Sequence, residues 1–388
     1  MLPGPGARVG ESATVAPRPL SAVVLAAGEG ARMRSSRPKP LHLLCGRAML
    51  LYVLDSLAEC AVGRVVVVVG HGAERVTKKL QDEEPDLALD FVEQHVQRGT
   101  GDAASVALTA FPDDVAADDL DDVLVLPGDT PLLRPSTVAR LVAAHRESDA
   151  ACTVLTAVLD DPTGYGRVVR GRDGRVARIV EQADASEDEA AIAEINTSIY
   201  CFRRSVLAPA LRRLSPENAQ GEYYLTDVVE VLHDAGYGVT SLVADDPAET
   251  SGVNDRVQLA AAEGELRRRT NEGWLCRGVT MVDPGRTYID ATVELAPDVT
   301  LFPGTILQGR TVVGERAEIG SSTTLVDCVI GPDAVLDTTV GRDAEVGAGA
   351  RVGPFAVLQP GASVAPGAVT GPFYTGLGAD DGADANRG

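Results

Sequence analysis

Basic residues are scarce in this chain. Its 388 residues include 35 Lys and Arg against 56 Asp and Glu, which gives a formal charge of −21 and a pI near 4.6. A surface with this balance repels nucleic acid and anionic membranes, so we expect neither as a partner. The few cations that do cluster are therefore expected to hold a small anion, since a phosphate needs only a few charges and backbone N–H groups.

The sequence also lacks membrane spans and cysteine pairs. No apolar run approaches the roughly 20 residues that a membrane helix needs, and the first residues lack the apolar region of a signal peptide. The six cysteines lie far apart without a CxxC pair, which argues against a disulfide framework and a metal-binding cysteine motif. These absences favour a location in the reducing cytoplasm.

Apolar runs alternate with helix-like segments over residues 20–254. Runs such as "RVVVVVG" are continuously apolar, as is typical of parallel strands buried on both faces. The pattern predicts an open, Rossmann-like α/β sheet, in which ligands bind at the carboxyl ends of the strands. Residues 1–19 are interpreted as a disordered tail, and residues 255–278 as one exposed linking helix.

The remaining sequence has a six-residue period. This period fits neither an amphipathic helix nor an alternating strand, but it is typical of a parallel β-helix whose short rungs stack their apolar corners. A Gly/Pro-rich linker would not keep the phase over several cycles. We expect the β-helix at 279–372, an irregular turn around Ile330 to Val340, and a disordered tail at 373–388. The periodic residues are Leu307, Val313, Ile319, Leu325, Val340, Val346, Val352, Leu358 and Val364.

The turn after the first apolar run carries the candidate anion site. "LAAGEGARM" lacks the third Gly of a dinucleotide fingerprint and the GK[ST] of a P-loop. It does place Gly28 and Gly30 where a ligand can approach the backbone, and Arg32 where the amino end of a helix favours anions. Lys39 lies between two prolines, Pro38 and Pro40, which direct it back toward the same strand end. A solvated basic loop is the alternative.

Two further residues are candidate metal ligands. Asp129 in "VLVLPGDTPLL" follows an apolar strand, so its carboxylate is expected at the carboxyl edge of the sheet, where a hard cation bridges it to nucleotide phosphates. An acidic turn residue is the alternative. Asn254 in "SGVNDR" is either the N-cap of the following helix or a second oxygen ligand of the same cation.

In combination, these segments resemble the bifunctional family of N-acetylglucosamine-1-phosphate uridylyltransferase/glucosamine-1-phosphate acetyltransferase. "LAAGEGARMRSSRPKPLH" is similar to the family signature LAAGxGTRMxSxxPKxLH, and "QHVQRGTGDA" and "GDTPLL" follow in the family's order. So do "GYGRVVR", "IVEQADA", "EINTSIYCF", "EYYLTDVV" and "GVNDRVQL", and the match covers about Ser21 to Val364. The resemblance implies a nucleotide-diphospho-sugar transferase domain followed by a left-handed β-helix of hexapeptide repeats.

The resemblance also implies a reaction and its residues. UTP and N-acetylglucosamine 1-phosphate would give UDP-N-acetylglucosamine and pyrophosphate with Mg²⁺, in a homotrimer assembled through the β-helix. Arg32 and Lys39 would neutralise the triphosphate. The other implied roles are uridine binding by Ala27, Gly28, Gln94, Gly99 and Thr100, sugar binding by Gly166, Glu181, Asn196 and Thr226, and metal binding by Asp129 and Asn254. For Glu181, the alternative is a solvent-exposed acid at a strand end.

The chain departs from the family pattern at several positions. No histidine follows His233, and Gln359 stands where the family has the Arg of its LRPG motif, so we expect no acetyl transfer and a β-helix that serves oligomerisation. Asp102 and Asp255 add negative charge near the expected polyanion, and Ser198 replaces a Gly. Two alternatives therefore stay open: a nucleotidyltransferase for another sugar 1-phosphate or for dTTP, and a catalytically silent scaffold that binds UDP-sugars.

Overall fold

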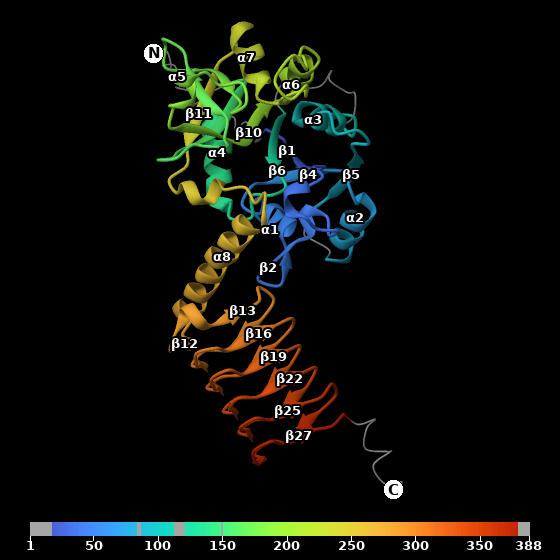
Figure 1. The fold of residues 1–388 in the computed structure, drawn as a ribbon, viewed down its shortest axis with the longest axis vertical. Coiled ribbons are helices and arrows are strands. Elements are labelled where there is room, and N and C mark those ends of the chain that lie inside the picture. Colours follow the sequence, from blue (N-terminus) through green and yellow to red (C-terminus); the bar gives the residue numbers. More distant parts are fainter. Residues whose placement is uncertain (1–17, 84–86, 112–120, 149, 379–388) are drawn as a thin grey trace, which may run out of the picture.

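The computed structural model describes residues 18–83, 87–111, 121–148 and 150–378. A nine-stranded sheet in the first part is followed by a long helix and three columns of short parallel strands (Figure 1). The expected tail at 1–19 lies almost wholly outside these residues. Within them, no helix is long and apolar enough to cross a membrane.

Along its main path the large sheet is parallel except for one central strand, which runs antiparallel to both of its neighbours, and two further strands at its side pair antiparallel with each other. Continuously apolar sequences such as "VVVVV" form its interior because both faces are covered. Along the sheet the order is β11 (Val239–Val243), β7 (Cys152–Val158), β10 (Glu194–Arg203), β6 (Asp122–Pro127), β1 (Leu20–Ala26), β4 (Val62–Val69) and β5 (Leu89–Glu93), with β8 (Arg167–Arg170) and β9 (Val176–Val180) beside β10.

Helices cover both faces of this sheet (Figure 1). One layer consists of α3 (Thr100–Leu108), α6 (Arg204–Leu211) and α7 (Asp227–Asp234), and the other of α1 (Met49–Asp55), α2 (Ala73–Asp82) and α4 (Pro135–Ser148). The shorter elements are the 3₁₀ turns η1 (Ala31–Met33), η2 (Lys39–Leu41), η3 (Pro247–Thr250) and η4 (Pro284–Arg286), the hairpin β2 (Leu43–Leu44) and β3 (Arg47–Ala48), and α5 (Glu187–Ala190).

The linking helix α8 (Arg256–Cys276) is less exposed than the sequence predicts. Asp255 caps it by accepting a hydrogen bond from the Gln258 backbone, 2.8 Å long. Ala262 and Leu266 are buried in a small apolar cluster with residues from the first part of the chain, including Leu132. The apolar residues of α8 are too few to reveal this contact in the sequence, because most of its surface is polar.

The last part of the chain is a left-handed parallel β-helix with three faces (Figure 1). Each short strand turns its first residue outward and the next inward, and three strands with their turns complete one coil, so an inward apolar residue recurs every sixth position. The three columns are β12 (Thr280–Met281), β15 (Thr300–Leu301), β18 (Glu318–Ile319), β21 (Val335–Leu336) and β24 (Arg351–Val352); β13 (Tyr288–Ile289), β16 (Ile306–Gln308), β19 (Thr324–Val326), β22 (Val340–Arg342), β25 (Val357–Leu358) and β27 (Thr375–Gly376); and β14 (Glu294–Leu295), β17 (Val312–Val313), β20 (Val329–Ile330), β23 (Glu345–Val346) and β26 (Ser363–Val364).

The slip in the period arises from shortened turns. Leu307 pairs with Leu325 one coil on, but Leu325 pairs with Gly341, only 16 residues farther along the chain. The turns that bring this about contain Asp327 and Thr338, both at positive φ. The irregularity therefore begins just before the expected segment at Ile330. It turns Gly341 inward and Val340 outward, so the assignment of Val340 to the inward periodic residues is wrong.

Regular structure also extends past the expected end of the β-helix. Thr375 and Gly376 form β27 and pair with β25, although we expected a disordered tail from residue 373. The sequence hides this coil because Gly376 takes the inward position, where a Cβ would lie 3.0 Å from Leu358. Residues 379–388 lie outside the described part of the chain.

Candidate active site

The edge where β1 and β6 end collects the cationic segment. Gly30 adopts φ +65°, and a Cβ at this position would lie 2.8 Å from the Lys39 Cβ. Both the positive φ and the close approach of the Lys39 side chain require a glycine at this position. Lys39 itself opens η2 directly after Pro38.

Lys39 joins the two candidate metal ligands. Its ammonium is bonded to the Asp129 carboxylate and donates a hydrogen bond of 2.9 Å to Asn254 Oδ1. The backbone fixes this meeting point, because the Gly128 N–H donates to Leu25 at the end of β1 and the Val253 N–H donates to the Asp129 carbonyl. The Lys39 and Asp129 side chains are 13 % and 23 % exposed, so solvent screens their attraction only in part.

The donors around Lys39 fit a hard divalent cation. A carboxylate and an amide oxygen converge on one positive charge, and oxygen ligands are what Mg²⁺ prefers. Among the described residues, no group of three or more His, Cys, Asp and Glu side chains is arranged to hold a metal ion. Asp129 and Asn254 alone would leave most positions for phosphate oxygens and water, which is the usual mode for Mg²⁺ beside nucleotides.

Arg32 lies in η1 on the exposed side of the same turn. Within the described ranges, no hydrogen bond or ion pair joins it to Lys39, Asp129 or Asn254. Arg32 therefore lies outside the hydrogen-bonded cluster that Lys39 forms. Arg32 and Lys39 are close in sequence, but only Lys39 contacts the two candidate metal ligands.

The candidate uridine residues form a second group beside the first. The buried Gln94 donates from Nε2 to the Gly99 carbonyl at 3.2 Å and to Asp102 Oδ2 at 2.8 Å. Gly99 adopts φ +106°, and Thr100, the first residue of α3, accepts a hydrogen bond from the Leu225 backbone. With both Nε2 hydrogens directed at protein acceptors, Oε1 is the end of the Gln94 amide that is left to accept from a ligand.

Asp102 has a local role that the sequence did not reveal. We expected its charge to act on a nearby polyanion, but it accepts the bond from Gln94 and lies 3.7 Å from the Arg98 guanidinium. Its charge is therefore partly balanced by Arg98, and its carboxylate orients the Gln94 amide.

The candidate sugar residues form a third group. Thr226 donates to Glu181 Oε1 at 3.0 Å, and burial raises the pKa of the Glu181 carboxyl above its usual range. Gly166 lies against Glu181, because a Cβ there would be 3.4 Å from Oε2, and its carbonyl accepts from the Asn196 backbone. Since β10 is antiparallel, its first residues reach the edge where the neighbouring parallel strands end.

Asn196 is less open to a ligand than the sequence suggests. Its Nδ2 donates to the Tyr200 hydroxyl at 2.9 Å, and its Oδ1 accepts from the Ser198 backbone at 3.1 Å. These bonds belong to an irregularity in the pairing of β10, where Ser198 adopts φ +61°. A Gly suits that backbone conformation, which explains the residue found at this position in the family pattern.

Sequence reasoning missed the acidic surroundings of Glu181. Asp227 begins α7 directly after Thr226, and burial, with help from Glu230 and Glu181, raises the pKa of its carboxyl to about 6. The motif "EYYLTDVV" contains Asp227, but nothing in its spacing indicates a neighbour 46 positions earlier in the chain. Only the packing of α7 on β9 brings the two acids together.

Comparison with known proteins identifies the first part of the chain. A model of the MobA-like NTP transferase domain matches residues 22–235, which include all strands of the large sheet up to β10. The chain belongs to this family. The matched residues thus contain the Gln94 and Glu181 groups in full and the Lys39 group except Asn254, which lies beyond them.

Curated relatives extend the similarity. "Bifunctional protein GlmU" of Trichlorobacter lovleyi is 48 % identical over 289 residues, which are 74 % of this chain and 61 % of that protein. The proteins of the same name from Shouchella clausii (45 % over 288 residues; 74 % and 61 %) and Mycobacterium avium strain 104 (46 % over 296 residues; 76 % and 60 %) are similar in extent. The chain spans about three fifths of the length of these relatives.

Proposed function

We propose that this NTP transferase makes UDP-N-acetylglucosamine and pyrophosphate from UTP and N-acetylglucosamine 1-phosphate. The observation that carries the proposal is the convergence of Lys39, Asp129 and Asn254 at the carboxyl edge of the sheet. Two anionic substrates repel each other, and this cluster supplies the opposite charge and the oxygen ligands that bring phosphates together. The resemblance to the uridylyltransferase family supplies the choice of substrates.

The reaction requires no protein nucleophile. A phosphate oxygen of the sugar 1-phosphate attacks the α-phosphorus of UTP, a new P–O bond forms, and the bond to the β-phosphate oxygen breaks as pyrophosphate leaves. The protein contributes position and charge. Lys39 and Arg32 would stabilise the negative charge that grows on the leaving pyrophosphate, and Lys39 would exchange its carboxylate partner for phosphate oxygens.

We propose Mg²⁺ as the metal. Asp129 and Asn254 would hold it, and it would neutralise phosphate charge at the reacting centre. Their donor atoms are the observation in favour, because both are oxygens and both already converge on a cation.

The uridine and sugar groups would orient the two substrates. Gln94 Oε1 is suited to accept the N3–H of a pyrimidine base, while Ala27, Gly28, Gly99 and Thr100 border the same edge. Glu181 and Thr226 would bind sugar hydroxyls, with Gly166 leaving room beside Glu181. Asn196 would meet the acetamido group only if its bonds to Tyr200 and Ser198 were exchanged or shared.

The β-helix supports a trimer in this proposal. The column β13–β16–β19–β22–β25–β27 is labelled in Figure 1. The first residue of each of its strands is uncharged and points away from the buried second residue, and the one exposed charge on its described strands is Arg342 at the end of β22. The other two columns each direct charged residues outward, such as Glu318 and Glu345. A second copy of the chain is the partner expected on the β13–β27 column. Its outward residues are Tyr288, Ile306, Thr324, Val340, Val357 and Thr375.

Two parts of the proposal concern what surrounds the reaction. We expect no acetyl transfer from this chain, because its β-helix residues include no histidine and Gln359 replaces the expected Arg. Acetylation of glucosamine 1-phosphate by the purified chain with acetyl-CoA would contradict this. We propose a cytoplasmic location, where UTP is available and where six free cysteines, four of them buried, are stable.

A substrate panel tests the proposal against its alternatives. The purified chain would be given Mg²⁺, either UTP or dTTP, and one of three sugars: N-acetylglucosamine 1-phosphate, glucosamine 1-phosphate or glucose 1-phosphate. The mass of the nucleotide sugar identifies the product. We expect UDP-N-acetylglucosamine as the main product. A different main product would favour the alternative nucleotidyltransferase, and binding of UDP-sugars without any product would favour the silent scaffold.

A further inference from the structure

The linking helix α8 is bonded to three segments of the NTP transferase domain. Near its start, Arg256 Nε donates to the Met33 carbonyl in η1 at 3.1 Å. Midway along it, Glu263 accepts from the Cys45 backbone at 2.7 Å. Farther along, Arg269 Nη1 donates to the Leu132 carbonyl at 2.7 Å. Each bond reaches a main-chain group, so it fixes the path of a loop rather than one side chain.

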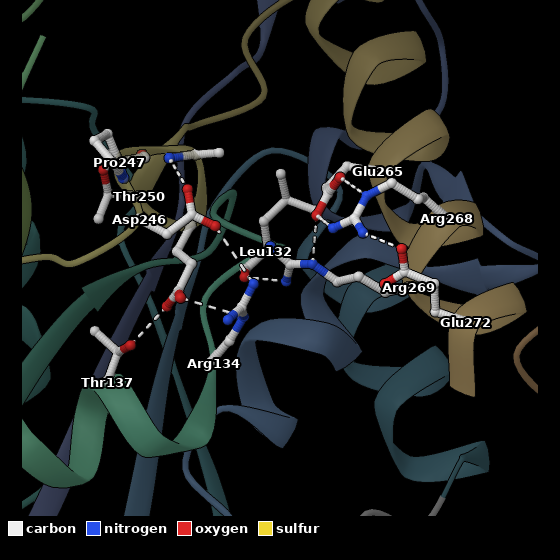
Figure 2. Close-up of polar contacts among 12 residues, drawn as sticks. Leu132, Arg134, Thr137, Asp246, Pro247, Thr250, Glu265, Arg268, Arg269 and Glu272 are labelled. Carbon is white, nitrogen blue, oxygen red and sulfur yellow. Dashed lines mark hydrogen bonds and ion pairs between the residues drawn. The ribbon is translucent and has the colours of Figure 1, made fainter. Parts of the chain in front are cut away.

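The Leu132 contact reaches the turn that carries Asp129. This turn runs from the end of β6 into α4, and Leu132 lies three positions after Asp129. Figure 2 shows the guanidinium of Arg269 directed at the Leu132 carbonyl. A second arginine holds the next residues from the other side, because Arg134 pairs with Glu249 at 3.2 Å and with Asp246 at 3.4 Å in and before η3.

The same helix fixes Asn254. Asp255 is the N-cap of α8, so Asn254 directly precedes the helix, and its backbone N–H donates to Gln258 Oε1 at 2.7 Å. The two residues that meet at Lys39 are thus both tied to α8, Asn254 through the start of the helix and Asp129 through Arg269. A helix is stiff over this distance, so it keeps the two attachments at a constant separation.

We infer that α8 is a positioning element of the transferase site and that Arg269 is its positioning residue for Asp129. This inference rests on the proposed uridyl transfer. Arg269 touches neither Asp129 nor Lys39, and acts by holding the carbonyl of Leu132. Its Nη2 is buried and has no hydrogen-bond partner among the described residues. The contact with the Leu132 carbonyl is therefore made although one donor of the guanidinium stays unsatisfied.

Arg268 provides a matched control. It is the neighbouring arginine on α8, it bonds the same Glu265 and also Glu272, and its side chain is 51 % exposed. Figure 2 shows it on the side of α8 that faces away from Leu132. Arg268→Ala therefore removes an arginine and its ion pairs from the same helix without removing a contact to the Asp129 turn.

The experiment compares the full-length chain with Arg269→Ala and Arg268→Ala in two measurements. Hydrogen–deuterium exchange of the peptide covering residues 128–134 reports whether the turn is held. Calorimetric binding of UTP over a series of Mg²⁺ concentrations reports whether the site is assembled, independently of turnover. For Arg269→Ala we expect exchange about tenfold faster, as the loss of one charged hydrogen bond implies, and about tenfold weaker Mg²⁺-dependent UTP binding. For Arg268→Ala we expect both within about twofold of wild type.

Each outcome decides the inference. Unchanged exchange in Arg269→Ala would overturn it. Faster exchange with unchanged Mg²⁺-dependent UTP binding would also overturn it, because Arg269 would then be merely structural. If the wild-type protein binds UTP with Mg²⁺ but releases no pyrophosphate, the proposed function is refuted. The positioning role of Arg269 would then still be supported by hydrogen–deuterium exchange and by Mg²⁺-dependent UTP binding. A wild type that binds no UTP would refute both.

Discussion

The ammonium of Lys39 is bonded to the carboxylate of Asp129, 90 residues away along the chain. The pair exists because η2 and the end of β6 reach the same edge of the sheet, where Asn254 joins them at 2.9 Å from the ammonium. A cation held by oxygen ligands at a strand edge is the arrangement that phosphate transfer needs, and the predictions below follow from it.

Gly28 offers a test of ligand approach that is separate from folding. A Cβ at this position would meet no atom within 4 Å, so the fold does not need a glycine here. We expect Gly28→Ala to leave the melting temperature nearly unchanged, as for most surface substitutions, and to raise the KM for UTP about tenfold because the nucleotide approaches this backbone. A thermal melt and initial rates measure both. A variant with wild-type KM would remove Gly28 from the nucleotide site.

Two explanations of the role of Asp102 predict opposite changes in the KM for UTP. If its main effect is to orient Gln94, Asp102→Asn should raise the KM for UTP about threefold to tenfold, since one charge-assisted hydrogen bond is weakened. If its charge mainly repels the triphosphate, the same change should lower the KM. The structure favours the increase, because Asp102 accepts from Gln94 and lies near Arg98. Asp82→Asn, an exposed change of equal charge on α2, is the control.

Asp227 makes stability depend on pH. Burial raises the pKa of its carboxyl to about 6, so the folded state holds this proton more tightly than the unfolded chain does. The resulting stability is present below about pH 4 and is lost as the pH rises through about 6. The free energy of unfolding of Asp227→Asn should therefore depend less on pH. Its difference from wild type should be about 1 kcal/mol more favourable at pH 7.5 than at pH 4, a value reduced because the side chain is partly exposed. Denaturant unfolding at several pH values measures it. An unchanged slope, as expected for Asp82→Asn, would contradict the raised pKa.

The β13–β27 column of the β-helix predicts which substitution disrupts the oligomer. Val340 and Val329 are exposed to nearly the same degree, 52 % and 50 %, but they lie on different columns. We expect the wild type to sediment as a trimer, Val340→Arg as a monomer because an unpaired charge would be buried, and Val329→Arg as a trimer. Analytical ultracentrifugation decides this, and disruption by Val329→Arg alone would assign the interface to another face.

The elements that sequence predicted well have strong local patterns. The continuously apolar β4 and β6 indicated a buried parallel sheet, and the six-residue period from Leu307 to Leu325 indicated the β-helix. The pattern failed where glycine takes an inward position. At Gly341 and Gly376, neighbouring leucines fill the space that a larger side chain would occupy, so the apolar period breaks although the coil continues.

The candidate site could be placed only in part. The sequence assigned Lys39 and Asp129 to strand ends, but their direct bond depends on the order in which strands enter the sheet. The contact of Arg269 with Leu132 was beyond prediction, because α8 has few apolar residues and a backbone carbonyl carries no sequence signal. The internal bonds of Asn196 likewise arise from the irregular pairing of β10, which period and propensity do not reveal.

Pyrophosphate release tests the central claim most directly. The measurement uses UTP, Mg²⁺ and N-acetylglucosamine 1-phosphate with wild type, Lys39→Ala and Lys78→Ala, an exposed lysine of α2. The account predicts release by wild type and Lys78→Ala, and a rate at least about a hundredfold lower for Lys39→Ala, the usual cost of one lost donor to transition-state charge. Release by Lys39→Ala at the wild-type rate, or none by a folded wild type that binds UTP, would contradict the account.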